Sequence, residues 1–123
     1  MSEQADRLKE RTFQFALDVI ELTKTFTLEE PGPTIRRQLT KSSTSVGANY
    51  RAACRARSHA EFTSRVEIVA EEADETVYWL DLADGAKLTK SPKLPRLQTE
   101  SRELTAIFSR CVGTARMNAK NSE

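Results

Sequence analysis

Six basic side chains between positions 36 and 57 have the types and spacing that offer the clearest chemistry. Residues 31–60 contain six Lys or Arg and no Asp or Glu. Such a segment attracts phosphate groups, and each phosphate that it neutralises adds a salt-dependent increment to nucleic-acid binding. Tyr50 is the one aromatic residue in this run, so stacking of unpaired bases is weakly supported. The candidate nucleic-acid-binding residues are Arg36, Arg37, Lys41, Arg51, Arg55 and Arg57.

The next segment carries the opposite charge. Residues 61–84 contain one Lys or Arg and eight Asp or Glu, although the whole chain has a formal charge of only +1. Opposite potentials on successive elements serve ligand binding, assembly or pairing between helices. Two hypotheses stay open. In the first, the basic segment binds RNA or DNA. In the second, it meets the acidic segment of a neighbouring subunit, and the chain is a homo-oligomeric scaffold or protein-interaction ring that binds no nucleic acid.

Two adjacent aromatic residues stand out in the acidic segment. Tyr78 and Trp79 lie beside the apolar seam rather than within it. Large aromatic side chains at such positions are enriched in protein interfaces. We therefore expect a subunit interface here, with a ligand-binding box as the less favoured alternative.

The usual arrangements of catalytic and metal-binding residues are missing from the sequence. A di-metal carboxylate site in a helical bundle needs two Glu-x-x-His pairs, and the chain has one histidine, His59, with no Glu three residues before it. There is no glycine-rich phosphate loop and no second histidine for a nucleophile–base set. Arg55 and Arg57 precede His59 too closely for the pattern of small helical ribonucleases. We expect a non-enzymatic protein without metal or cofactor, in which Cys54 and Cys111 are reduced, small apolar fillers.

A group of small polar residues organises the middle of the chain. Ser42, Ser45 and Asn49 recur at helical spacing and predict a helix that packs closely on its neighbour, with Asn49 inside the seam. Ser58 and Glu61 form the Ser-x-x-Glu pattern of a capping box, which marks the start of the next helix.

Apolar residues at alternating spacings of four and three predict four amphipathic helices. The ranges are about 5–26, 34–56, 59–84 and 95–117, joined by short Pro- and Gly-containing turns. Phe13 is expected to widen the first seam, Val77 to lie in the third, and Gly85 to form a left-handed cap. Residues 1–123 are therefore predicted to form a single all-α domain, an antiparallel up-down-up-down four-helix bundle.

The N-terminal residues and the hydropathy of the sequence indicate where in the cell the protein is expected. The N-terminal residues MSEQADRLKE are polar and mixed in charge, unlike a signal peptide. No apolar run approaches the roughly 20 residues that a membrane span needs. The expected location is the cytoplasm.

Two stretches carry a resemblance to a known family: QLTKSSTSVGANYRAACRARSHAEF at 38–62 and EEADETVYWL at 71–80. Over about residues 10–117 the chain resembles the four helix bundle protein family, also called the intervening-sequence protein of large-subunit ribosomal RNA genes. The resemblance implies a ring-shaped homopentamer without known catalytic activity. That family is similar to the accessory protein of diversity-generating retroelements, which implies a reverse transcriptase or another protein as a possible partner. Ala52 stands where this branch usually has Glu, which makes the second helix wholly basic.

Overall fold

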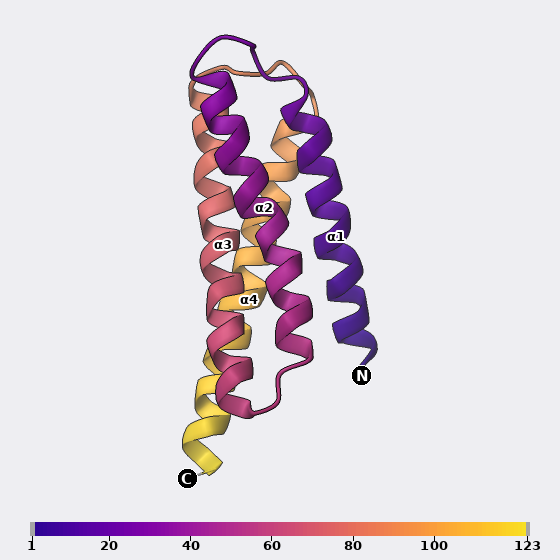
Figure 1. Cartoon of the computed structure of the whole chain (residues 1–123), viewed down its shortest axis with the longest axis vertical. Helices are drawn as coiled ribbons and strands as arrows, with labels where there is room; N and C mark the ends of the chain where they lie inside the picture. The colour runs from indigo at the N-terminus through magenta and orange to yellow at the C-terminus, as the bar shows by residue number, and fades with distance from the viewer. Residues whose placement is uncertain (1, 123) are drawn as a thin grey trace.

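The computed structural model describes residues 2–122, with side chains described for residues 2–120, and its regular structure is entirely helical. The helices are α1 (Glu3–Thr23), α2 (Gly32–Cys54), α3 (His59–Gly85) and α4 (Leu94–Ser122). Successive helices run in opposite directions and form a four-helix bundle (Figure 1). The four predicted ranges fall on these helices, although α1 ends three residues earlier and α4 continues five residues further than predicted. None of these helices combines the length and hydrophobicity of a membrane span.

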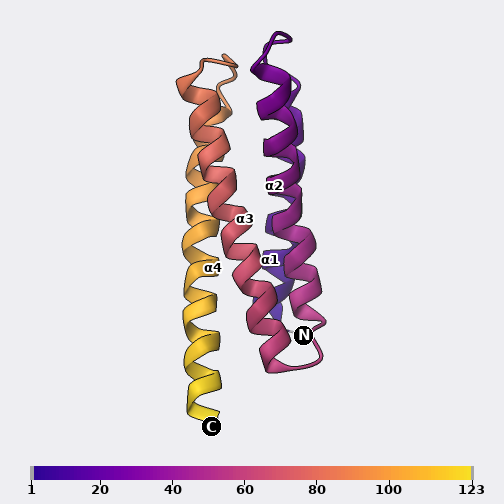
Figure 2. The ribbon, with the colours of Figure 1, turned by 60° about the vertical axis from the view of Figure 1, so that its left-hand side comes forward.

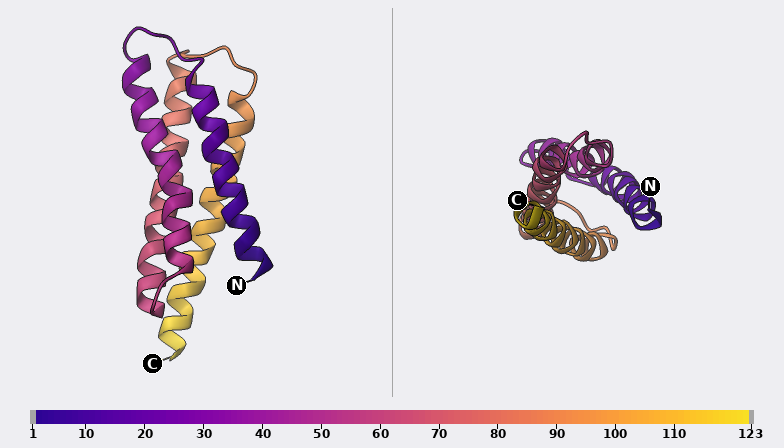
Figure 3. Two further views of the ribbon diagram at one scale, coloured as in Figure 1. Left: turned by 45° about the vertical axis from the view of Figure 1, so that its right-hand side comes forward. Right: turned by 90° about the horizontal axis from the view of Figure 1, so that it is seen from below.

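The four helices are not packed equally. The α2 helix packs against α1 and α3, and α3 packs against α4, whereas α1 and α4 meet over a short stretch only. Figure 2 shows α2 in front of α1 and α3 beside α4, and in the view from below the ribbons of α1 and α4 spread apart on one side of the bundle (Figure 3). The core between the helices is filled by apolar side chains, among them Phe15, Val19, Leu39, Val46, Val69, Leu80, Leu104 and Phe108.

Most residues of the predicted seams are buried, but a single position on each of three helices differs from the prediction. Phe13 is 65% exposed, and Thr12 takes the buried position, because Thr12 lies against Gly47, where α1 and α2 approach closely. On α2, Asn49 is only half-buried, and the buried residue is Tyr50, whose ring lies 5.2 Å from that of Phe108. On α3, Val77 is half-buried, and Thr76 faces the core instead.

A buried polar contact joins α2 to α3. The hydroxyls of Ser42 and Thr76 lie 2.9 Å apart, and neither side chain is exposed to solvent. The Thr76 hydroxyl also lies 2.8 Å from the Glu72 carbonyl, and the Ser42 hydroxyl lies 3.4 Å from the Leu39 carbonyl. The small side chain of Ser42 lets the helices approach at this point, and its partners satisfy the hydroxyl.

The left-handed residue that caps the C-terminus of α3 is Lys87 and not, as predicted, Gly85. Gly85 is the last helical residue, while Lys87 has a φ of 55° in the left-handed region. The Lys87 N–H donates to the Asp84 carbonyl and the Leu88 N–H to the Ala83 carbonyl, both at 3.0 Å. This pattern of bonds is a Schellman motif, and the burial of Leu88 completes it.

Candidate nucleic-acid interface

The outer face of α2 carries a straight stripe of four cations. Arg37, Lys41, Arg51 and Arg55 are all exposed, and their spacing of four, ten and four residues brings them to one side of the helix. Eighteen residues of α-helix span about 27 Å. Thr44 and Ala48 lie between the two pairs and are also exposed, so the stripe has small, uncharged residues at its centre. We refer to these four cations as the basic stripe.

Opposite charges reach the basic stripe only at long range, where Glu30 interacts with Arg37 and Glu72 interacts with Lys41. Across residues 2–120, no carboxylate lies within ion-pair distance of any of the four. The side chain of Arg37 donates a hydrogen bond only to the Thr34 hydroxyl, at 3.2 Å. Several arginines of other helices are paired, for example Arg102 with Asp81 and Arg116 with Glu67. The basic stripe therefore presents its charge to solvent.

Two of the six predicted cations lie apart from the basic stripe. Arg36 is exposed but points about 100° away from Arg37 around the helix axis. Arg57 lies in the turn between α2 and α3, where its backbone N–H donates to the Glu61 carboxylate at 3.0 Å. The structure thus brings four of the six together and places the other two at its edges.

Tyr50 lies in the core, away from the basic surface. It is 6% exposed and packs against Phe108. Burial, together with a hydrogen bond to Cys54, raises the pKa of the Tyr50 phenol. Because its ring faces inward, Tyr50 offers no stacking surface to a base.

The polar residues of the predicted structural motif bond mainly to the backbone. The Ser45 hydroxyl donates to the Lys41 carbonyl at 2.8 Å, and the Asn49 amide donates to the Ser45 carbonyl at 2.9 Å. At the start of α3, the Ser58 hydroxyl accepts from the Glu61 N–H at 3.0 Å. The Glu61 carboxylate in turn accepts from the Arg57 N–H, one residue before the usual capping-box donor, and this bond lowers the pKa of Glu61.

The outer face of α3 is acidic and partly apolar. Glu71 and Glu75 are exposed, as are Ile68, Tyr78 and Leu82, with Tyr78 at 58%. The Tyr78 and Trp79 rings meet edge to face at 5.0 Å. Trp79 is half-buried, packs partly against the core, and donates its indole N–H to Glu75 at 3.2 Å.

Glu72 lies on α3 one turn before Thr76, near the edge of the helix that faces α2. Burial raises the pKa of Glu72, with a further increase from Glu75, while the positive charge of Lys41 partly offsets the shift. The basic and acidic helices therefore interact at their common edge, although most of both charged faces points outward.

Histidine and the cysteines show no sign of a metal site. His59 Nε2 lies 2.7 Å from the Ala115 carbonyl and so connects α3 to α4. Cys54 and Cys111 are free and half-buried, and burial raises the pKa of the Cys111 thiol. In the part of the chain whose side chains are described, no three metal-ligating side chains come together.

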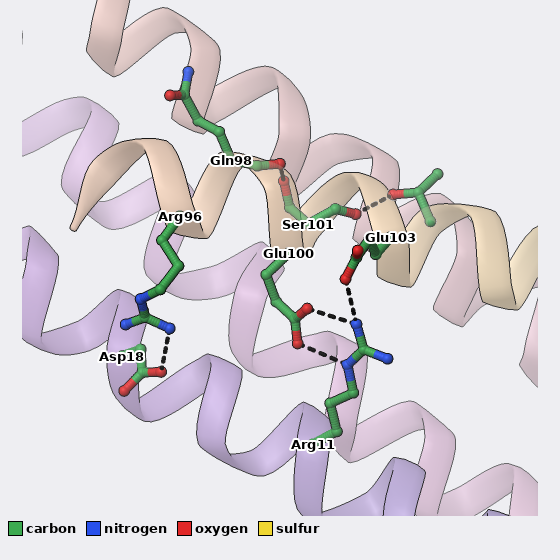
Figure 4. Close-up of polar contacts among 8 residues, drawn as sticks. Arg11, Asp18, Arg96, Gln98, Glu100, Ser101 and Glu103 are labelled. Carbon is green, nitrogen blue, oxygen red and sulfur yellow. Dashed lines mark hydrogen bonds and ion pairs between the residues drawn. The ribbon is translucent and has the colours of Figure 1, made fainter.

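Sequence reasoning missed the polar contacts between α1 and α4. Arg11 donates from Nε to Glu100 at 2.8 Å and from Nη2 to Glu100 at 2.6 Å and to Glu103 at 2.7 Å (Figure 4). Arg96 and Asp18 form a second, looser pair at 3.6 Å. These partners are far apart in the chain, and each is an ordinary surface charge on its own helix, so no local pattern identifies them.

Comparison with known proteins agrees with this architecture. The model of the 23S rRNA-intervening sequence protein family matches residues 6–110. A crystal structure of a protein of unknown function from the S23 ribosomal protein family of Bacteroides thetaiotaomicron is similar, with a TM-score of 0.79 and 28% sequence identity. The similarity covers 89% of this chain and 97% of that one. The search of curated proteins gives no match. On the family match, which spans most of the bundle, the chain belongs to the 23S rRNA-intervening sequence proteins.

Proposed function

We propose that the protein binds nucleic acid through the phosphate backbone, using the basic stripe of α2. The single observation that carries the proposal is the line of four exposed cations without ion-pair partners in residues 2–120. The family name refers to 23S rRNA and the name of the structural neighbour's family to a ribosomal protein, so structured rRNA is the first probe.

The expected mode of binding is electrostatic. The cations lie on one rigid helix and meet phosphates without rearrangement of the backbone. Thr44 and Ala48 have short side chains, so the strand can approach the middle of α2 closely. Because Tyr50 is buried and the basic stripe itself carries no aromatic residue, binding depends on charge rather than on base identity. Four phosphate contacts predict that affinity falls about 50- to 150-fold between 50 and 200 mM salt.

Filter binding with a structured rRNA fragment at these two salt concentrations tests the proposal. The variant R37Q/R51Q/R55Q removes three charges of the basic stripe and should lower the slope of log K against log salt by roughly 2 to 3. The matched control K90Q/K93Q/K120Q removes three exposed charges elsewhere and should keep most of the affinity. Failure of the unmodified protein to bind at 50 mM salt would end this proposal.

The acidic face of α3 supports a second candidate, a homo-oligomeric scaffold or protein-interaction ring. In it, the acidic and apolar face of α3 in one copy meets the arginines of α2 in the next. The two outer faces differ and point in different directions, so the contact is head-to-tail and repeats until a ring closes. Five copies follow from the family resemblance. Any reverse transcriptase or other protein partner, and the cytoplasmic location, stay predictions.

Light scattering separates the two candidates. The R37Q/R51Q/R55Q variant should keep the oligomeric mass if these side chains bind nucleic acid, and should dissociate if they bind the next subunit. Tyr78→Ala tests the α3 face more cleanly than Trp79→Ala, because Trp79 also packs against the core. An unchanged mass for Tyr78→Ala would remove Tyr78 from the interface.

A further inference from the structure

The open side of the bundle forms a groove between α1 and α4. Arg11 and Arg96 connect these helices along the upper part of the bundle, through the bonds to Glu100, Glu103 and Asp18. The ribbons of α1 and α4 diverge toward the N-terminus of α1 (Figures 1 and 3). A cavity of about 800 Å³ lies between them, and on α4 it extends from Ile107 to Asn118. Eleven residues of helix correspond to a length of about 16 Å.

The groove has an apolar floor. Leu8 and Ala115 are buried beneath it, while Phe62, Ile107 and Cys111 are only half-buried. Three helices supply these side chains, and they are partly open to water because α1 and α4 do not close over them. Covering them with an apolar ligand is favourable by the hydrophobic effect.

The charged side chains of the groove are all basic. Arg7 comes from α1 and Arg110 from α4, so each of the two walls contributes a guanidinium group. Both are exposed, and neither forms an ion pair with a carboxylate among residues 2–120, whereas Arg11 is occupied by Glu100 and Glu103. None of the Asp or Glu side chains among residues 2–120 lines the groove. An anionic group between Arg7 and Arg110 would meet two donors of charge-assisted hydrogen bonds.

We infer that this groove binds a single-chain fatty carboxylate, with the chain along the apolar floor and the carboxylate between Arg7 and Arg110. The volume of the groove lies within the range of small-molecule sites in proteins, and sites between the helices of bundles are common. The groove lies between α1 and α4, and none of the four cations of the basic stripe lines it. Arg7 also lines a neighbouring pocket together with Arg51 of the basic stripe, so the two sites adjoin at α1. The inference nevertheless rests on other residues than the proposed nucleic-acid interface and does not depend on it.

Calorimetric titration of the full chain with dodecanoate, at concentrations below micelle formation, tests the inference. Dodecyltrimethylammonium has the same chain with a positive head group and serves as the matched ligand control. The variant R7Q/R110Q should weaken dodecanoate binding at least tenfold, whereas K93Q, an exposed cation away from the groove, should bind as the unmodified protein does. Amide chemical shifts should change at residues of the groove and not along α2.

Four results would overturn the inference: no binding of dodecanoate, equal binding of the cationic ligand, unchanged affinity of R7Q/R110Q, or shift changes confined to other surfaces. Arg7 and Arg110 are exposed, and so the circular dichroism of R7Q/R110Q should match that of the unmodified protein and show that folding is intact.

Discussion

Arg11 and Glu100 form a two-pronged ion pair between α1 and α4, with N–O distances of 2.8 and 2.6 Å. The Glu100 side chain is 22% exposed and that of Arg11 is 36% exposed, so the pair is partly shielded from water. Hydrogen bonds to Glu100 raise the pKa of Arg11. The backbones of α1 and α4 come close over a short stretch only, and this pair, with the contacts Arg11–Glu103 and Arg96–Asp18, joins the two helices there.

Arg11→Gln should lower the free energy of unfolding by about 1 kcal/mol, after allowance for the exposure of the guanidinium. Arg11→Lys should recover only part of this, because an ammonium group cannot form both bonds in the same geometry. Urea unfolding gives the free energies, and amide exchange should accelerate in α1 more than in α3. The control is Lys24→Gln, which removes an exposed pair with Glu21 and should change stability little. Equal effects of Arg11→Gln and Lys24→Gln would contradict the role given to Arg11.

Gly47 and Gly113 provide a matched test of the close approach between α1 and α2. Both lie within helices, but a Cβ at Gly47 would lie 3.2 Å from the Thr12 hydroxyl, whereas nothing lies within 4 Å at Gly113. Gly113→Ala should stabilise the protein by about 1 kcal/mol through helix propensity. Gly47→Ala should destabilise it by about 1 kcal/mol, because Thr12 is buried and cannot move away. Thermal unfolding measures both, and Thr12→Ala should relieve the loss in the Gly47→Ala background. A stabilising Gly47→Ala would show that this contact is loose.

Local pattern was sufficient to predict the four helices and their order. Each helix carries its own seam of apolar residues, and Ser58 with Glu61 marks the start of α3 directly. The outward position of the basic stripe also follows from spacing, since Arg37 and Lys41 repeat the phase of Arg51 and Arg55.

The exact rotation and spread of the helices could not be predicted, because they depend on pairs of distant residues. Whether Thr12 or Phe13 faces the core depends on Gly47, on another helix. The groove between α1 and α4 depends on where Arg11 meets Glu100, 89 residues along the chain. The lack of ion pairs along the basic stripe, among residues 2–120, likewise depends on where the carboxylates of α3 lie in space.

Lys87 holds a left-handed backbone conformation that favours glycine, with φ at 55°. Lys87→Gly should therefore raise the free energy of unfolding by about 0.5–1 kcal/mol, the relief of strain being partly offset by the greater freedom of glycine in the unfolded chain. Lys87→Ala removes the same side chain but keeps the strained backbone, and should give no such gain. Chemical denaturation compares the three proteins. Equal stabilisation by Ala and Gly would assign the effect to the lysine charge and not to the backbone.

The acid stability of the protein should depend in part on Glu61. The hydrogen bond from the Arg57 N–H, followed by the bond from Arg65, holds the pKa of Glu61 below its usual value of 4.5. A carboxylate whose pKa is lowered by folding stabilises the native state above its unfolded pKa, and this contribution is lost as the pH falls through the folded pKa. The free energy of unfolding should thus decline as the pH falls below about 4.5.

Glu61→Gln keeps an acceptor for the Arg57 N–H but cannot titrate, so its stability should decline less steeply over the same acid range. Denaturation at a series of pH values measures this difference, with Glu10→Gln as a control that removes an exposed carboxylate from α1. Glu72 acts in the opposite sense: burial raises its pKa, so its contribution favours the folded state at low pH and is lost as the pH rises through that pKa. Glu72→Gln should therefore steepen the acid-side decline that Glu61→Gln makes shallower. Parallel curves for the two variants would contradict both assignments, since the titrations of Glu61 and Glu72 affect stability with opposite signs.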